Sequence, residues 1–157
     1  MIRQIGSRLG AGVLAALVLG VLAGGLARVL MRVLVVLSGE EGRFSLTGTL
    51  GIVTIFVAMM VPGAVAAALG ARGTSRVLLA LGATVLLFQS VVIPLQEDRT
   101  AFATADGALQ ALVIVVLVAF PLVIVAQAVA TSRLAAALAR RLGPASAALR
   151  EVAVVTR

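Results

Sequence analysis

Two arginines inside an otherwise apolar segment are the residues of this chain best suited to bind a charged ligand. Arg28 and Arg32 lie between Leu9 and Leu37, a run that holds no other charged residue. They are four residues apart, so both lie on one face of a helix. A charge near the middle of a bilayer costs at least about 2.5 kcal/mol, so this face should contact protein or water. The alternative is an interfacial helix along the outer head groups, starting near Gly25.

Polar side chains on three further apolar segments are expected at the same depth. Thr54, Gln89 and Gln110 lie near the same ends of their segments, and Glu97 and Asp98 follow closely behind Gln89. Together with a guanidinium pair, such groups could bind a phosphate or a carboxylate. The predicted ligand-binding residues are Arg28, Arg32, Gln89, Gln110 and Thr54. The alternative is that these groups only satisfy one another, because buried polar side chains need partners.

Several chemistries are excluded by residue types that the chain lacks. It contains no Cys and no His, which removes disulfides, thiolate nucleophiles, imidazole acid–base catalysis and the usual zinc ligands. The sequence has no phosphate-binding loop, nucleotide fingerprint or metal-ligand cluster. We therefore expect no cofactor and no metal.

The composition indicates a membrane protein. Hydrophobic residues make up 62% and charged residues 12% of the 157 residues, and a soluble domain is nearer half apolar and a quarter charged. Four apolar runs reach the roughly 20 residues that a bilayer requires, at about 9–37, 50–71, 77–95 and 107–130. An open sheet edge is not tolerated in hydrocarbon, so each run should be a helix. The predicted fold class is an all-α membrane bundle of four helices.

The arginines gather in alternate connecting segments, which lie on the same side of the four spans. Nine of them precede the first span, join the second to the third, or follow the fourth, and Glu151 is the only acid in those segments. By the positive-inside rule, both termini should be cytoplasmic, in the inner (plasma) membrane. A cleaved signal peptide ending near Ala27 is the alternative. It is disfavoured because the apolar run is long and resumes after Arg28.

The two halves of the chain align with each other at an offset of 57 to 59 residues. Glu40 falls on Glu97, and Pro62 on Pro121, so the chain could be two duplicated helical hairpins. Chance alignment of apolar segments is the alternative.

Each proline should bend its helix. Small residues should let helices approach closely, namely Gly10, Gly12, Gly20, Gly24, Gly25, Gly63 and Gly70.

The tail, residues 131–157, differs from the spans. Leucines recur every fourth residue from Leu134, and Arg133, Arg140 and Arg141 lie in another sector. This pattern predicts a basic amphipathic helix that ends at Gly143 and rests on the anionic inner leaflet, with membrane lipid as its partner. No aromatic side chains are interleaved for base stacking, so we expect no nucleic-acid partner.

The stretch from Gly25 to Leu50 contains LARVLMR, GEEGRFS and TGTL. In these motifs the chain resembles small four-span membrane proteins that are common in GC-rich actinobacteria. The likeness covers the first hairpin, and its most specific positions are Arg28, Arg32, Phe44, Ser45 and Gly48. It implies the four-span architecture and no particular activity.

The leading functional prediction is binding of a polar or anionic head group, or of a partner subunit, at an outward-facing site around Arg28 and Arg32. A second is an enzyme in which Glu97 or Asp98, as a protonated acid, protonates an isoprenoid-like lipid. A third is a structural accessory subunit, which the small-residue helix faces favour. Expected partners are thus a lipidic or anionic small molecule, a second copy of the chain, or a membrane complex.

Overall fold

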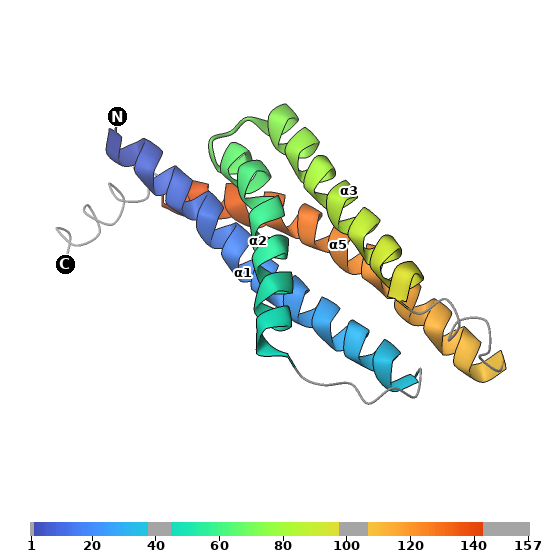
Figure 1. Ribbon diagram of the computed structural model, residues 1–157. Helices are drawn as coiled ribbons and strands as arrows, with labels where there is room; N and C mark the ends of the chain where they lie inside the picture. Colours follow the sequence, from blue (N-terminus) through green and yellow to red (C-terminus); the bar gives the residue numbers. More distant parts are fainter. Residues whose placement is uncertain (1, 38–44, 98–106, 143–157) are drawn as a thin grey trace, which may run out of the picture.

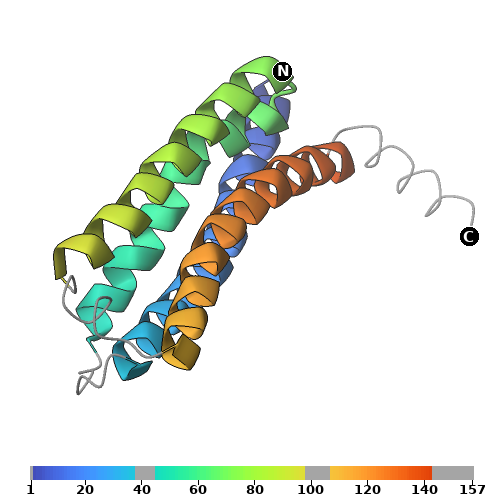
Figure 2. The ribbon, with the colours of Figure 1, turned by 90° about the vertical axis from the view of Figure 1, so that its right-hand side faces the viewer.

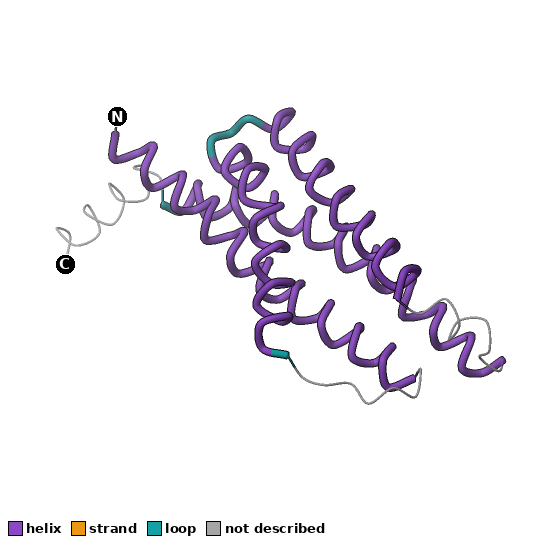
Figure 3. The backbone as a smooth tube through the Cα atoms, in the orientation of Figure 1, coloured by secondary structure: helices purple, strands orange, loops and turns teal. Residues whose placement is uncertain are grey.

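The described part of the chain forms four helices, two of them much longer than a bilayer requires (Figure 1). The computed structural model describes residues 2–37, 45–97 and 107–142. The helices are α1 (Ile2–Leu37), α2 (Leu46–Ala68), α3 (Arg72–Glu97) and α5 (Gly107–Arg141). Each contains a segment long and apolar enough to cross a membrane. The predicted all-α architecture of four candidate spans is confirmed, and in the described ranges every regular element is a helix (Figure 3).

The fourth helix does not stop where the sequence suggested. A separate tail helix was expected from residue 131, but α5 runs without a break from Gly107 to Arg141. Thr131, Ala135 and Ala139 explain the continuation, because all three are buried against the rest of the bundle. Residues 131–141 therefore belong to the bundle. The rest of the predicted tail, residues 143–157, lies outside the described residues.

Glycine explains how closely α1 approaches α2. A Cβ added at Gly12, Gly20 or Gly24 would come within 2.8 to 2.9 Å of a Cα atom of α2. That is closer than real Cβ atoms approach, so only glycine permits this packing. The predicted close approach is confirmed at these three positions, whereas Gly10 and Gly25 have nothing within 4 Å of an added Cβ.

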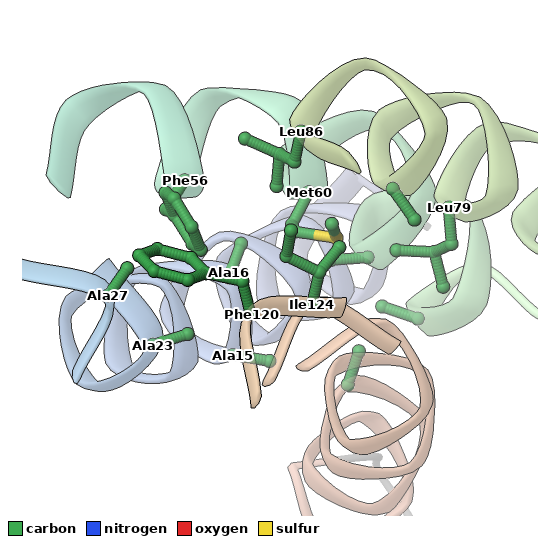
Figure 4. Close-up of a cluster of buried hydrophobic side chains, with 14 of the residues drawn as sticks. Ala15, Ala16, Ala23, Ala27, Phe56, Met60, Leu79, Leu86, Phe120 and Ile124 are labelled. Atoms are coloured by element: carbon green, nitrogen blue, oxygen red, sulfur yellow. The ribbon is translucent and has the colours of Figure 1, made fainter. Parts of the chain in front are cut away.

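Two large side chains lie at the centre of the bundle. Met60 of α2 and Ile124 of α5 are fully buried, and Phe56 and Phe120 lie beside them (Figure 4). The buried residues of α1 are alanines and glycines, so the core is filled mainly from α2, α3 and α5. Outside this core the surface is apolar: Phe88 is 67% exposed and Leu122 is 64% exposed. Contact of such a surface with the hydrocarbon of a bilayer has no solvation cost, whereas its exposure to water is unfavourable.

The two halves of the chain are both helical hairpins, but their proportions are reversed. The first pairs a helix of 36 residues with one of 23, and the second pairs 26 residues with 35. Pro62 and Pro121 do lie inside α2 and α5. The duplication itself stays a prediction. Figure 2 shows that α5 is bent and that its last turns diverge from the start of α3, as expected of a helix interrupted by proline.

Candidate functional site

A cavity of about 720 Å³ lies at the end of the bundle where α1 starts, α2 meets α3, and α5 ends. Five arginines from three helices surround it: Arg8, Arg72, Arg76, Arg133 and Arg140. Two serines, several alanines and one glycine complete the lining. The sequence analysis assigned Arg133 and Arg140 to a tail helix on the anionic inner leaflet and the other three arginines to membrane orientation. Their gathering around one space is a property of the tertiary structure.

The link between α2 and α3 places two of the arginines. Gly70 takes a φ of +88°, which an L side chain rarely adopts. The Gly70 amide donates to the Ala67 carbonyl at 3.1 Å, and the Ala71 amide donates to the Ala66 carbonyl at 2.9 Å. These two bonds form a Schellman motif, which ends α2 abruptly. Helix α3 therefore starts at once, with Arg72 as its first residue.

A buried serine fastens the start of α3 against α2. Ser75 is 2% exposed, and its Oγ donates to the Gly63 carbonyl at 2.8 Å. An added Cβ on Gly63 would lie 3.0 Å from the Leu79 nitrogen, so the two backbones are already in close contact. Ser75 lies between Arg72 and Arg76 in the first turns of α3 and itself lines the cavity. Its hydrogen bond thus holds that turn, and both guanidinium groups, at the edge of the cavity.

Helix α5 supplies the opposite wall. Ala135 and Ala139 are buried against the bundle, while Arg133 and Arg140 are exposed on the same helix. Ser132 also lines the cavity, but its Oγ donates to the Val129 carbonyl of its own helix at 2.8 Å. Because residues 131–141 are packed into the bundle, Arg133 and Arg140 line the cavity.

The charged side chains that line this cavity are all positive. None of the described residues that line it is acidic. Within the described ranges the only acidic residue is Glu97, at the far end of α3. The first turn of α3 also carries no acid. The partial positive charges at the N-termini of α1 and α3 are offset by the partial negative charges at the C-termini of α2 and α5, so the net positive charge comes from the arginines. The site can bind a multiply charged anion, and guanidinium groups hold phosphate oxygens through paired N–H donors.

The predicted outer site has a different geometry. Arg28 is half-buried, and one of its guanidinium nitrogens lies 4.0 Å from the position of an added Cβ on Gly48. It therefore lies beside the first turn of α2, where the Ser45 Oγ accepts a hydrogen bond from the Gly48 amide at 3.1 Å. Arg32, one turn further along α1, is exposed.

The other members of the predicted set face outward. Thr54, Gln89 and Gln110 are all exposed on their helices. None of them lines the basic cavity, which lies at the opposite end of the bundle. Asp98 and the side chain of Glu97 lie outside the described residues, so their predicted catalytic role stays a prediction.

Two buried polar residues on α5 escaped the sequence analysis. Gln127 is 4% exposed and its Nε2 donates to the Phe56 carbonyl at 3.2 Å, which joins α5 to α2. Its Oε1 and the Oγ1 of Thr131 are buried without a hydrogen-bond partner among the described residues. The signal was present, because an amide inside an apolar span calls for a partner across the helix interface. Thr131 was missed because the predicted fourth span ended at residue 130, whereas α5 continues to Arg141.

Comparison of the chain with protein-family models, with curated proteins and with solved structures finds no match. The function must therefore be argued from the geometry of the two arginine sites.

Proposed function

We propose that this protein is a multi-pass membrane protein that binds a phosphate-bearing anion in the basic cavity. The observation that carries the proposal is the gathering of five arginines around one space of about 720 Å³, with no acid among its described lining residues. Arginine stays charged at every physiological pH, and its planar fork matches phosphate geometry. A bound anion also offsets the mutual repulsion of five like charges.

The cavity faces the cytoplasm in this proposal, and the protein lies in the inner (plasma) membrane. The support is the arginine-rich composition of the N-terminus, the α2–α3 link and the end of α5, which the positive-inside rule assigns to the cytoplasm.

This orientation can be tested directly because the chain has no cysteine. We expect a membrane-impermeant maleimide to label Ala101→Cys, in the α3–α5 link, on intact spheroplasts. Thr74→Cys, near the start of α3, should be labelled only in inverted vesicles. The reverse pattern would place the cavity outside the cell.

Binding is tested on the protein purified in a non-ionic detergent, with inorganic pyrophosphate as the probe and calorimetry as the readout. We expect saturable binding that weakens as salt is raised, because surface charge interactions are screened. The double variant Arg76→Gln/Arg133→Gln should lower the affinity at least tenfold, since it removes one guanidinium from each wall. Saturable binding of pyrophosphate that is equal in this variant and the wild type would overturn the proposal.

The outer arginine pair is the second candidate. It is favoured by the position of the Arg28 guanidinium beside the first turn of α2, where backbone N–H groups and the helix dipole attract anions. The same titration includes Arg28→Gln/Arg32→Gln. If this variant loses pyrophosphate binding and the cavity variant keeps it, the site around Arg28, Arg32 and their predicted polar neighbours is the functional one.

A further inference from the structure

We infer that the ligand of the basic cavity is a membrane lipid whose head group carries two phosphates. The inference rests on the proposed function and names the class of ligand. It follows from the charge of the cavity, the character of its walls and the apolar surface next to it.

The number and spacing of the arginines exceed what one phosphate needs. A phosphate monoester carries about −1.5 to −2 charge at pH 7, whereas five guanidinium groups surround this cavity. Arg133 and Arg140 are seven residues apart on one helix, so their Cα atoms are about 10 Å apart along its axis. A head group with two phosphates can engage both ends of this row and the facing wall at Arg72 and Arg76 at the same time, and it balances more of the positive charge than one phosphate does.

The walls between the arginines indicate what the rest of the head group is. They are formed by small side chains, among them Ala67, Ala68, Ala136 and Ala139. No aromatic side chain and no Asn, Gln, Asp or Glu occurs among the described lining residues. A nucleotide ligand usually requires stacking or hydrogen-bond partners for its base and ribose. This lining suits a head group that is recognised by its phosphates alone.

The surface beside the cavity provides a place for an acyl or prenyl chain. Val77 directly follows Arg76 on α3 and is 59% exposed, and Val129, one turn before Arg133 on α5, is 45% exposed. The two helices diverge at this end of the bundle (Figure 2). A lipid can thus place its phosphates among the arginines while its chain stays in the bilayer along α3 and α5. Basic pockets at the cytoplasmic ends of membrane helices bind anionic lipid head groups by this arrangement.

Native mass spectrometry of the detergent-purified protein tests the inference. The probes are cardiolipin and a polyprenyl diphosphate, which carry two phosphates, phosphatidylglycerol, which carries one, and inorganic pyrophosphate, which has no chain. We expect one or both two-phosphate lipids to bind at least tenfold more tightly than phosphatidylglycerol and than pyrophosphate. Preference for one of the two shows whether the phosphates are separated by a linker or joined directly.

The variant Arg76→Gln/Arg133→Gln should abolish the preference for two phosphates. Arg43→Gln/Arg99→Gln removes the same charge from the α1–α2 and α3–α5 links and should retain it. If phosphatidylglycerol binds as tightly as the two-phosphate lipids, the head group need not carry two phosphates. If pyrophosphate binds as tightly as these lipids, the ligand need not be a lipid. Both results leave the proposed function standing. If no probe binds, the proposed function and the inference fail together.

Discussion

The two ends of the bundle both carry arginines, but they use them differently. At one end, five arginines from α1, α3 and α5 surround a cavity. At the other, Arg28 and Arg32 come from a single helix; Arg28 is half-buried beside α2, and Arg32 is exposed. The difference shows that a multiply charged site in this fold depends on several helices meeting. Arg28 and Arg32 lie on one face of α1 and supply only two charges, and the surroundings of that pair depend on the neighbouring helix α2.

The position of the cavity follows from how closely two pairs of helices pack, α1 with α2 and α3 with α5. Along α1 and α2, glycines bring the backbones into contact and leave no space. At the basic end, α5 presents alanines to the bundle and bends away from α3 (Figure 2). The close α1–α2 contact stabilises the fold, and the wider α3–α5 separation provides the space in which we propose that a ligand binds. Three substitutions separate these roles, in order of expected effect.

The largest effect should come from filling the cavity without changing its charge. Ala136 lines the cavity, so Ala136→Leu should weaken binding of the preferred phosphate ligand by tenfold or more through steric exclusion. Ala126→Leu adds the same bulk at an exposed position of α5 and should leave the affinity within about twofold. The readout is the dissociation constant by calorimetry. Equal affinity in Ala136→Leu and Ala126→Leu would show that the arginines act only as a diffuse surface charge.

The next effect concerns the close α1–α2 contact. Gly20→Ala would place a Cβ 2.8 Å from the Val57 Cα, so the helices must separate at a cost of about 1–3 kcal/mol in the free energy of unfolding. Gly10→Ala, with nothing within 4 Å, should be neutral or slightly stabilising, because alanine favours a helix. Denaturant titration in mixed micelles gives both values. A stable Gly20→Ala protein would mean that α1 and α2 do not need this close approach.

The smallest effect should come from the serine that anchors α3. Ser75→Ala removes the hydrogen bond to the Gly63 carbonyl and should lower the free energy of unfolding by about 1 kcal/mol. Ligand affinity should fall two- to fivefold, because the turn that carries Arg72 and Arg76 is less well held. Ser132→Ala is the matched control. Ser132 also lines the cavity, but its bond stays within α5, so its loss should change affinity less. Equal losses in both variants would argue against a positioning role for Ser75.

Sequence reasoning identified the four spans and the glycines at the α1–α2 seam, because apolar run length and small-residue spacing are local properties. It ended the fourth span at residue 130 and expected a separate basic amphipathic helix from residue 131, whereas α5 continues to Arg141. The structure packs this continuation into the bundle through Thr131 and Ala135. Arg28 was correctly singled out as unusual, but its neighbour at Gly48 could not be deduced, since it depends on where α2 begins beside α1.

The amino-acid sequence by itself determined that this chain forms long apolar helices and that most of its arginines lie outside the apolar runs, in alternate connecting segments. Both properties follow from the demand of hydrocarbon for continuous, internally hydrogen-bonded segments. Only the tertiary structure decided which arginines share a cavity. Their meeting depends on the abrupt end of α2 at Gly70, the anchoring of Ser75 and the divergence of α5 from α3. The first two features lie within residues 63–75, whereas the position of α5 relative to α3 depends on packing between distant parts of the chain, so no single local pattern encodes the combined geometry.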